Sequence, residues 1–147
     1  MKMQLLNERL YVAPQISPDD LKHLKSVGVT SVIAARPEGE TKDQPPMDLI
    51  RAAADEAGIQ VNQIPVVPGQ ISAEQVAQFR ELVNASQGIV LAYCRSGMRA
   101  CMLWALDAAE QGTPVAEILR TTQAAGHDIS KLAPRLDELA NSAAVEN

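Results

Sequence analysis

Short apolar runs alternate along the chain with longer segments in which apolar residues recur at helical spacing. The apolar runs predict strands at residues 10–14, 30–35, 60–66 and 88–93. The segments of helical periodicity predict helices at residues 17–28, 47–58, 72–85, 97–111, 114–125 and within 131–142. Strands that alternate with helices favour right-handed crossover connections. We therefore expect an α/β fold, with a mainly parallel central sheet and helices on both of its faces.

Local signals mark several of the helix boundaries. Ser17, followed by Pro18, has the pattern of an N-cap with proline in the first turn. Ser72 and Gln75 have the spacing of a capping box, and Gly58 has the position of a C-terminal glycine cap. These signals set two expected helix starts and one expected helix end.

Composition limits the number of domains and the class of partner. The chain has 147 residues, of which 46% are hydrophobic and 3% aromatic, and a formal net charge of −5. This length fits a single domain, residues 1–147, with one core. The acidic charge and the few aromatic residues argue against nucleic acid as a partner. No stretch suits a signal peptide or a transmembrane helix, so we expect a cytoplasmic protein that does not bind a membrane.

The loops that follow the predicted strands are the expected place for a ligand. In parallel α/β sheets, ligands bind beyond the carboxyl ends of the strands. The loops at residues 36–46, 67–71 and 94–99 follow three of the strands and should meet at that edge. Because the chain is acidic overall, any anion site there has to be built locally.

The segment VLAYCRSGMRAC, residues 90–101, carries the strongest chemical signal. A strand leads into Cys94, and a helix begins near Gly97, so that backbone N–H groups form a cradle for an anion. The helix dipole, the amide donors, Arg95 and Arg99 all favour the thiolate of Cys94. The segment therefore predicts a nucleophile inside an anion site. The alternative is an inert buried cysteine with two solvated arginines.

Four other polar residues carry weaker signals. Arg36 is a candidate for contact with the anion, and Glu38 or Glu40 for orienting Arg99, although a solvated loop is the favoured interpretation. Cys101 is expected to be a small core residue, with a resolving thiol as the alternative.

The cysteines and histidines match no zinc spacing, so neither a metal nor another cofactor is expected. His127, which lies beside Asp128 and follows Gly126, fits a polar cap at a helix end. His23 is expected at the surface.

A cysteine, a loop and an arginine in this order resemble the active sites of rhodanese-like sulfurtransferases and protein tyrosine phosphatases. The wider sequence, from RLYVAPQISPDDLKHLKSVGVTSVIAARPEGE through IPVVPGQIS and CRSGMR to TTQAAGHD, resembles a bacterial family with a dual-specificity-phosphatase-like fold. That family occurs alone or fused to a metallo-β-lactamase-like enzyme of sulfide detoxification. The resemblance implies that Cys94 is the nucleophile and Arg99 the anion clamp. It also implies a cradle made by the backbone amides of Arg95, Ser96, Gly97 and Met98.

Departures from the phosphatase pattern favour sulfur chemistry over phosphoryl transfer. Only four residues separate Cys94 from Arg99, where such phosphatases have five, so the loop suits a smaller ligand. Tyr93 and Ala100 stand where those phosphatases have histidine and serine or threonine. Residues 66–72 contain no carboxylate to act as a general acid. Sulfur transfer releases sulfite or a thiolate of low basicity, and neither needs an acid.

The preferred hypothesis is a sulfurtransferase that works through a persulfide on Cys94. Sulfane sulfur would pass from a small anionic donor, either thiosulfate or a persulfide, to a thiol, cyanide or sulfite. Two alternatives stay open: a phosphatase that forms a phosphothiolate on Cys94, and a non-catalytic module that binds an anion such as phosphate. Arg36 joins the cradle residues as an expected substrate-binding residue, and the resemblance implies a persulfide dioxygenase as a candidate partner.

Overall fold

A five-stranded sheet forms the centre of the protein, which is described here by a computed structural model covering residues 2–146, with side chains as far as residue 143. The strands are β1 (Gln4–Leu5), β2 (Leu10–Ala13), β3 (Val29–Ala34), β4 (Gln60–Gln63) and β5 (Ile89–Tyr93). Their order across the sheet is β1-β2-β5-β3-β4. β1 is antiparallel to β2 and the other neighbours are parallel, so the expected mainly parallel sheet is confirmed.

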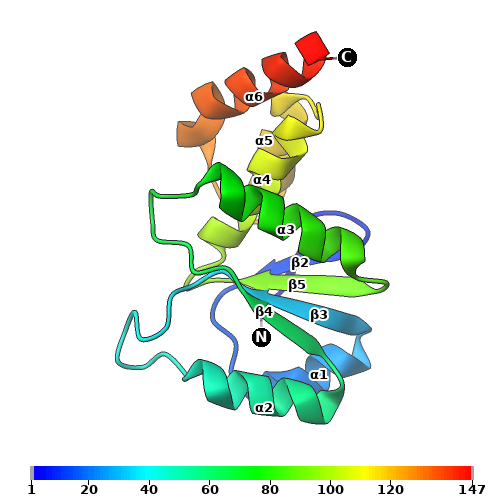
Figure 1. Ribbon diagram of the computed structural model, residues 1–147, viewed down its shortest axis with the longest axis vertical. Coiled ribbons are helices and arrows are strands. Elements are labelled where there is room, and N and C mark those ends of the chain that lie inside the picture. Colours follow the sequence, from blue (N-terminus) through cyan, green and yellow to red (C-terminus); the bar gives the residue numbers. More distant parts are fainter. Residues whose placement is uncertain (1, 147) are drawn as a thin grey trace.

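Helices cover both faces of this sheet. They are α1 (Asp20–Ser26), α2 (Met47–Ala57), α3 (Ala73–Ala85), α4 (Met98–Glu110), α5 (Val115–Ala124) and α6 (Ala133–Glu146), with a short 3-10 helix, η1, at Ser130–Leu132. α1 and α2 lie on one face and α3 and α4 on the other, with α5 and α6 stacked beyond α4 (Figure 1). None of the described helices is long and apolar enough to cross a lipid bilayer.

Strand β5 lies between β2 and β3 at the middle of the sheet and is buried on both faces because helices cover both of them (Figure 1). Leu91 and Tyr93 belong to the apolar cluster beneath α1 and α2. Val90 and Ala92 belong to the cluster beneath α3 and α4. A strand buried on both faces is typical of a parallel sheet and explains the continuous apolar run in the sequence. Cys94 continues the alternation and lies in the second cluster.

Two of the predicted helix boundaries are confirmed. The hydroxyl of Ser72 accepts a hydrogen bond from the Gln75 N–H at 3.1 Å, and Gln75 Oε1 accepts one from the Ser72 N–H at 3.1 Å, which completes the capping box. Gly58 follows α2 in the left-handed conformation, with a φ of 73°.

Three other predicted boundaries are wrong, and β1 was not predicted. α6 runs from Ala133 to Glu146, past the expected limit of residue 142. α1 begins at Asp20 and its N-cap is Asp19, not Ser17. The Ser17 N–H instead donates to Asp20 Oδ2 at 2.8 Å, while Pro18 and Asp19 form a turn. β4 ends at Gln63, since Pro65 has no N–H to extend the ladder as far as residue 66.

Candidate active site

Loops from the carboxyl ends of the parallel strands meet around the cysteine loop, residues 94–99. The Gln15 N–H, which follows β2, donates to Arg95 O at 3.2 Å. Arg99 Nη1 donates to Val66 O, on the loop that follows β4, at 2.7 Å. The carboxyl edge of the sheet therefore brings together residues that are far apart in the sequence, as expected for this type of fold.

The cysteine loop holds the thiol beneath a backbone amide. The Gly97 N–H donates to Cys94 Sγ at 3.1 Å, and Gly97 has a φ of 98°, a conformation that glycine adopts without strain. This amide and the N-terminus of α4 stabilise negative charge on the sulfur. The Met98 N–H donates a hydrogen bond to Ser96 Oγ at 3.3 Å. The N–H groups of Arg95 and Ser96 have no partner in the described part of the chain, so both are available to an anion.

The residues of the cysteine loop differ in their exposure to solvent. Cys94 has no exposed surface, whereas Arg95 and Ser96 are exposed and Met98 is half-buried. The thiol thus lies inside the loop, while Arg95 and Ser96 present their side chains to solvent.

Arg99 is fixed in place by a carboxylate from another loop. Its Nη1 and Nη2 donate to the two carboxylate oxygens of Glu40 at 2.9 and 2.8 Å, and Nη1 also donates to Val66 O. These bonds use three of the five N–H groups of the guanidinium, so Nε–H and one Nη2–H remain to interact with the nearby Cys94 sulfur or with an anion. Although burial by itself lowers the pKa of Arg99, Glu40 and the nearby Cys94 raise it overall. Arg99 is thus an oriented cation that can chelate an anion.

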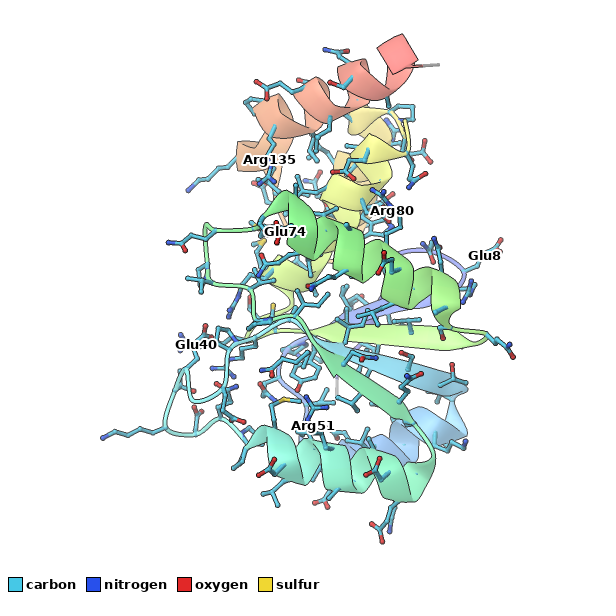
Figure 2. The ribbon with its side chains drawn as sticks, viewed as in Figure 1. Glu8, Glu40, Arg51, Glu74, Arg80 and Arg135 are labelled. Atoms are coloured by element: carbon cyan, nitrogen blue, oxygen red, sulfur yellow. The ribbon has the colours of Figure 1, made fainter. Side chains whose placement is uncertain are left out.

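A second arginine holds the same carboxylate. Arg36 is only 3% exposed, and its Nε donates to Glu40 Oε1 at 2.9 Å. The other two donated bonds of Arg36 go to Gln15 Oε1 at 2.8 Å and Thr41 Oγ1 at 3.0 Å. The hydrogen bond from Arg99 lowers the pKa of Glu40 to about 2, against the effect of burial and with further help from Arg36. Glu40, labelled in Figure 2 on the loop between β3 and α2, is therefore ionised at neutral pH and cannot donate a proton.

Residues 36–46 form a loop that is only partly solvated: Glu38, Gly39, Lys42, Asp43 and Pro46 are exposed, whereas Arg36 is buried. Gln44 Oε1 accepts the Glu40 N–H at 2.8 Å, and Glu38 Oε2 accepts the Met47 N–H at the start of α2 at 2.9 Å. The loop is thus held by its own polar side chains. The alternative interpretation, in which a glutamate orients the arginine of the cysteine loop, fits the structure with Glu40 in that role.

His127, which the sequence indicated only as a polar cap, lies against the cysteine loop. A Cβ added at Gly97 would be 3.0 Å from His127 Nε2 and 3.4 Å from the carbonyl carbon of Ala13. Burial lowers the pKa of His127, which favours the neutral imidazole. The contact joins segments distant in the sequence. The sequence offered one signal for this contact: His127 lies in TTQAAGHD, a segment in which the chain resembles the bacterial family.

Cys101 and Tyr93 are both removed from the cradle. Cys101 lies on α4 and is fully buried in the apolar cluster on that face of the sheet. Burial, with a smaller effect of the Cys94 charge, raises its pKa to about 12. Tyr93 points to the opposite face of the sheet, where its hydroxyl donates to Met47 Sδ at 3.5 Å. Burial raises the pKa of Tyr93 to about 12. Tyr93 is thus a core residue and does not replace the histidine that precedes the cysteine in phosphatases.

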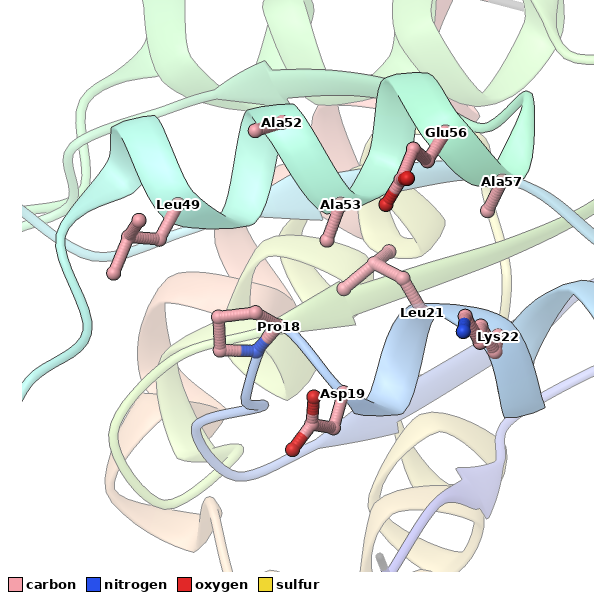
Figure 3. A pocket seen from close by; sticks show the side chains of 9 residues that line it. All are labelled: Pro18, Asp19, Leu21, Lys22, Leu49, Ala52, Ala53, Glu56 and Ala57. Carbon is pink, nitrogen blue, oxygen red and sulfur yellow. The ribbon is translucent and has the colours of Figure 1, made fainter.

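A hollow of about 660 Å³ lies elsewhere, between α1 and α2 (Figure 3). Its lining residues are Pro18, Asp19, Leu21, Lys22, Leu49, Ala52, Ala53, Glu56 and Ala57. None of these belongs to the cysteine loop, and none is a cysteine or an arginine. The hollow is therefore separate from the candidate active site.

The fold and the cysteine loop together define a phosphatase-like domain of the protein-tyrosine-phosphatase type. The catalytic core of the PP-IP phosphatase SIW14 from S. cerevisiae, in complex with citrate, shares this fold. It has a TM-score of 0.71 and 16% identity, and the match covers 93% of this chain and 83% of that chain.

The chain belongs to the family of phosphatase-like domains of beta-lactamase hydrolase-like proteins, whose model matches residues 2–111. A beta-lactamase hydrolase-like protein of Xylella fastidiosa is 37% identical over 107 residues, which are 73% of this chain and 25% of that protein. The chain thus spans about a quarter of the length of the curated relatives it matches. A candidate phosphatase from Neisseria meningitidis, known from its crystal structure, is 35% identical with a TM-score of 0.87, covering 95% of this chain and 99% of that chain. These relatives favour the phosphatase alternative over the sulfurtransferase hypothesis.

Proposed function

We propose that the protein is a cysteine-dependent phosphatase in which Cys94 accepts a phosphoryl group from a small anionic substrate. The observation that carries the proposal is the position of an amide-stabilised sulfur beside an oriented arginine. The Gly97 amide binds Cys94 Sγ, and Glu40 holds Arg99 with two N–H groups left over. Membership of a phosphatase-like family and the likeness to the Neisseria protein support the proposal.

The reaction proceeds in two displacements at phosphorus. The thiolate of Cys94 attacks, an S–P bond forms, and the P–O bond to the leaving group breaks with its electron pair on the departing oxygen. Water then attacks the phosphothiolate, the S–P bond breaks, and phosphate, a proton and the thiolate are released. The free amides of Arg95 and Ser96 and the free N–H groups of Arg99 bind the phosphoryl oxygens in both steps.

The lack of a proton donor limits the class of substrate. Residues 66–72 contain no carboxylate, and Glu40 is ionised between Arg36 and Arg99. A leaving oxygen that needs a proton would depart slowly, because general acid catalysis contributes about 10²–10⁴-fold. The proposed substrates are therefore phosphates with a stable leaving anion: aryl phosphates, acyl phosphates or phosphoanhydrides.

A second candidate, sulfur transfer, is favoured by the short spacing between Cys94 and Arg99 and by the same lack of an acid. In that reaction the thiolate takes the outer sulfur of thiosulfate, sulfite leaves, and the Cys94 persulfide passes its sulfur to a thiol, cyanide or sulfite. The relatives found for the chain do not support this activity. A persulfide dioxygenase partner, a cytoplasmic location and a purely anion-binding role remain predictions from the sequence.

The test is hydrolysis of a series of phosphate monoesters whose leaving groups range from nitrophenol to an alkyl alcohol. We expect turnover of the nitrophenyl ester, a steep fall in kcat/KM as the leaving group becomes more basic, and no activity in Cys94→Ser. Mass spectrometry of acid-quenched protein should find phosphate on Cys94. Thiocyanate formation from thiosulfate and cyanide, without hydrolysis of any ester, would support the sulfurtransferase instead. Phosphate binding without either reaction would leave only the anion-binding module.

A further inference from the structure

A small polar hollow lies beside the cysteine loop. It has a volume of about 210 Å³, and its lining residues are Gln15, Arg36, Thr41, Asp43, Gln44 and Arg95. We call it the Arg36–Arg95 pocket. Pockets that enclose a whole drug-sized ligand have volumes of roughly 300–1,000 Å³. The Arg36–Arg95 pocket therefore suits one functional group of a ligand.

The charges that face this pocket are two arginines and one carboxylate. Arg36 is almost fully buried and keeps one unused N–H on each of its two terminal nitrogens. The exposed Arg95 side chain makes no hydrogen bond or ion pair within residues 2–143. Asp43 accepts a hydrogen bond from Thr41 at 2.5 Å, which is the main cause of its lowered pKa, with a smaller effect of the two arginines. Glu40 pairs with both Arg36 and Arg99, so the three arginines and two carboxylates around the pocket and the cradle leave one net positive charge, and free N–H donors remain on Arg36 and Arg95.

The pocket and the cradle for the phosphoryl group are built from shared parts. Arg95 directly follows Cys94, and its carbonyl is held by the N–H of Gln15, a pocket residue. Glu40 Oε1 accepts hydrogen bonds both from Arg36 of the pocket and from Arg99 of the cradle. The pocket and the cradle are therefore adjacent in the structure.

We infer that the Arg36–Arg95 pocket binds a second anionic group, a carboxylate or a phosphate, of the molecule whose phosphoryl group reaches Cys94. This inference rests on the proposed function and deepens it, because it names the substrate class as small molecules with two anionic groups close together. The unpaired Arg95 and the remaining donors of buried Arg36 bind that second group through charge-assisted hydrogen bonds.

Three phenyl phosphates with one ring and different meta substituents test the inference. The substituents are a neutral carbamoyl group, a carboxylate of similar shape, and a second phosphate. We expect kcat/KM to be about tenfold higher for the ester with the carboxylate or the second phosphate than for the carbamoyl ester. One charged hydrogen bond accounts for a difference of this size. The better of the two anionic substrates identifies the group that the pocket prefers. Equal kcat/KM for all three would overturn the inference while leaving the phosphatase proposal intact.

For each variant we compare the ratio of kcat/KM for the carboxylate ester to kcat/KM for the carbamoyl ester. A change that affects the chemical step equally for both esters cancels in this ratio. Arg95→Gln keeps the backbone amide of the cradle and should bring the ratio close to one. Asp43→Asn removes the opposing charge and should raise the ratio. Arg120→Gln, an exposed change of the same charge on α5, is the control and should keep the wild-type ratio. If Arg95→Gln lowered kcat/KM equally for every substrate, its side chain would serve the cradle and the inference would be wrong.

Binding separates failure of the pocket from failure of the proposed reaction. Calorimetry with Cys94→Ser measures the affinity of the carboxylate and carbamoyl esters without turnover. If the wild type hydrolyses none of the esters, the phosphatase proposal fails. Tighter binding of the carboxylate ester, lost in the Cys94→Ser, Arg95→Gln double variant, would then still support the pocket. Equal affinities, or no binding, would overturn it.

Discussion

The carboxylate of Glu40 binds both terminal nitrogens of Arg99, at 2.9 and 2.8 Å, across 59 residues of sequence. Arg99 lies in the first turn of α4, whereas Glu40 lies on the loop between β3 and α2. The plane of a guanidinium is fixed when a carboxylate binds it through two parallel hydrogen bonds. The loop after β3 therefore sets the orientation of an arginine that another element supplies.

Replacement of Glu40 by glutamine should weaken catalysis by loosening Arg99. Hydrogen bonds to charged groups are worth about 1.5–3 kcal/mol, so kcat/KM on nitrophenyl phosphate should fall about 10- to 100-fold. Glu38→Gln makes the same change two residues earlier, where the side chain only accepts the Met47 N–H, and should keep near wild-type activity. Wild-type kcat/KM in Glu40→Gln would show that the carboxylate does not orient the arginine.

The same carboxylate should make the stability of the fold depend on pH. The pKa of Glu40 in the folded protein is about 2, below its ordinary value of 4.5, so the folded state favours the ionised form. The resulting stability is fully present above pH 4.5 and is lost as the pH falls toward 2, since the unfolded chain then binds the proton first. Urea denaturation from pH 7 to 2 should show a smaller loss in Glu40→Gln than in the wild type. Parallel pH profiles for the two proteins would contradict this assignment.

Replacement of Gly97 by alanine should destabilise the protein in two separable ways. A left-handed conformation costs an L-residue about 1–2 kcal/mol, and the new methyl group would also lie 3.0 Å from His127 Nε2. Gly69→Ala is the matched control, because Gly69 has a φ of 78° and no atom within 4 Å of the added Cβ. Urea denaturation should show a larger loss for Gly97→Ala than for Gly69→Ala. When His127→Ala is added to Gly97→Ala, the loss of stability should fall to that of Gly69→Ala. If it does not, the His127 imidazole is not what the added methyl group contacts.

The two cysteines should differ sharply in their effect on catalysis. Cys94→Ser should abolish hydrolysis, since an unactivated hydroxyl does not replace the thiolate. Cys101→Ala should keep most of the activity and cost about 1 kcal/mol of stability, as a small core truncation does. A disulfide between the two residues on peroxide treatment, together with loss of activity in Cys101→Ala, would instead identify Cys101 as a resolving thiol.

The central part of the site could be predicted from the sequence because its determinants are local. A buried strand, a cysteine, a glycine and a helix follow one another within residues 88–111, and neighbouring residues fix that geometry. The strand pattern likewise indicated the layers of the fold, because a strand buried on both faces has to be apolar throughout.

The contacts that complete the site could not be predicted because they join distant segments. A loop rich in Glu, Lys, Asp and Pro has the composition of a solvated connection, and nothing local shows that Arg36 is buried or that Glu40 meets Arg99. The contact of His127 with Gly97 depends in the same way on tertiary packing. β1 is a two-residue edge strand, too short for a periodic pattern.

The position of β5 between β2 and β3 determines when the candidate site can form during folding. β2 and β3 do not pair with each other, because β5 separates them and pairs with both. A growing chain that has not yet made Ile89 contains Glu40 and Arg36 but lacks the strand that draws their loop toward the β2 loop. β2 and β3 each pair with β5, which lies far along the chain, and such pairing is slow. The entropy cost of closing the long loops has to be met before the stabilising contacts form. Cys94 and Arg99 can thus meet the loop that carries Glu40 only after β5 has entered the sheet.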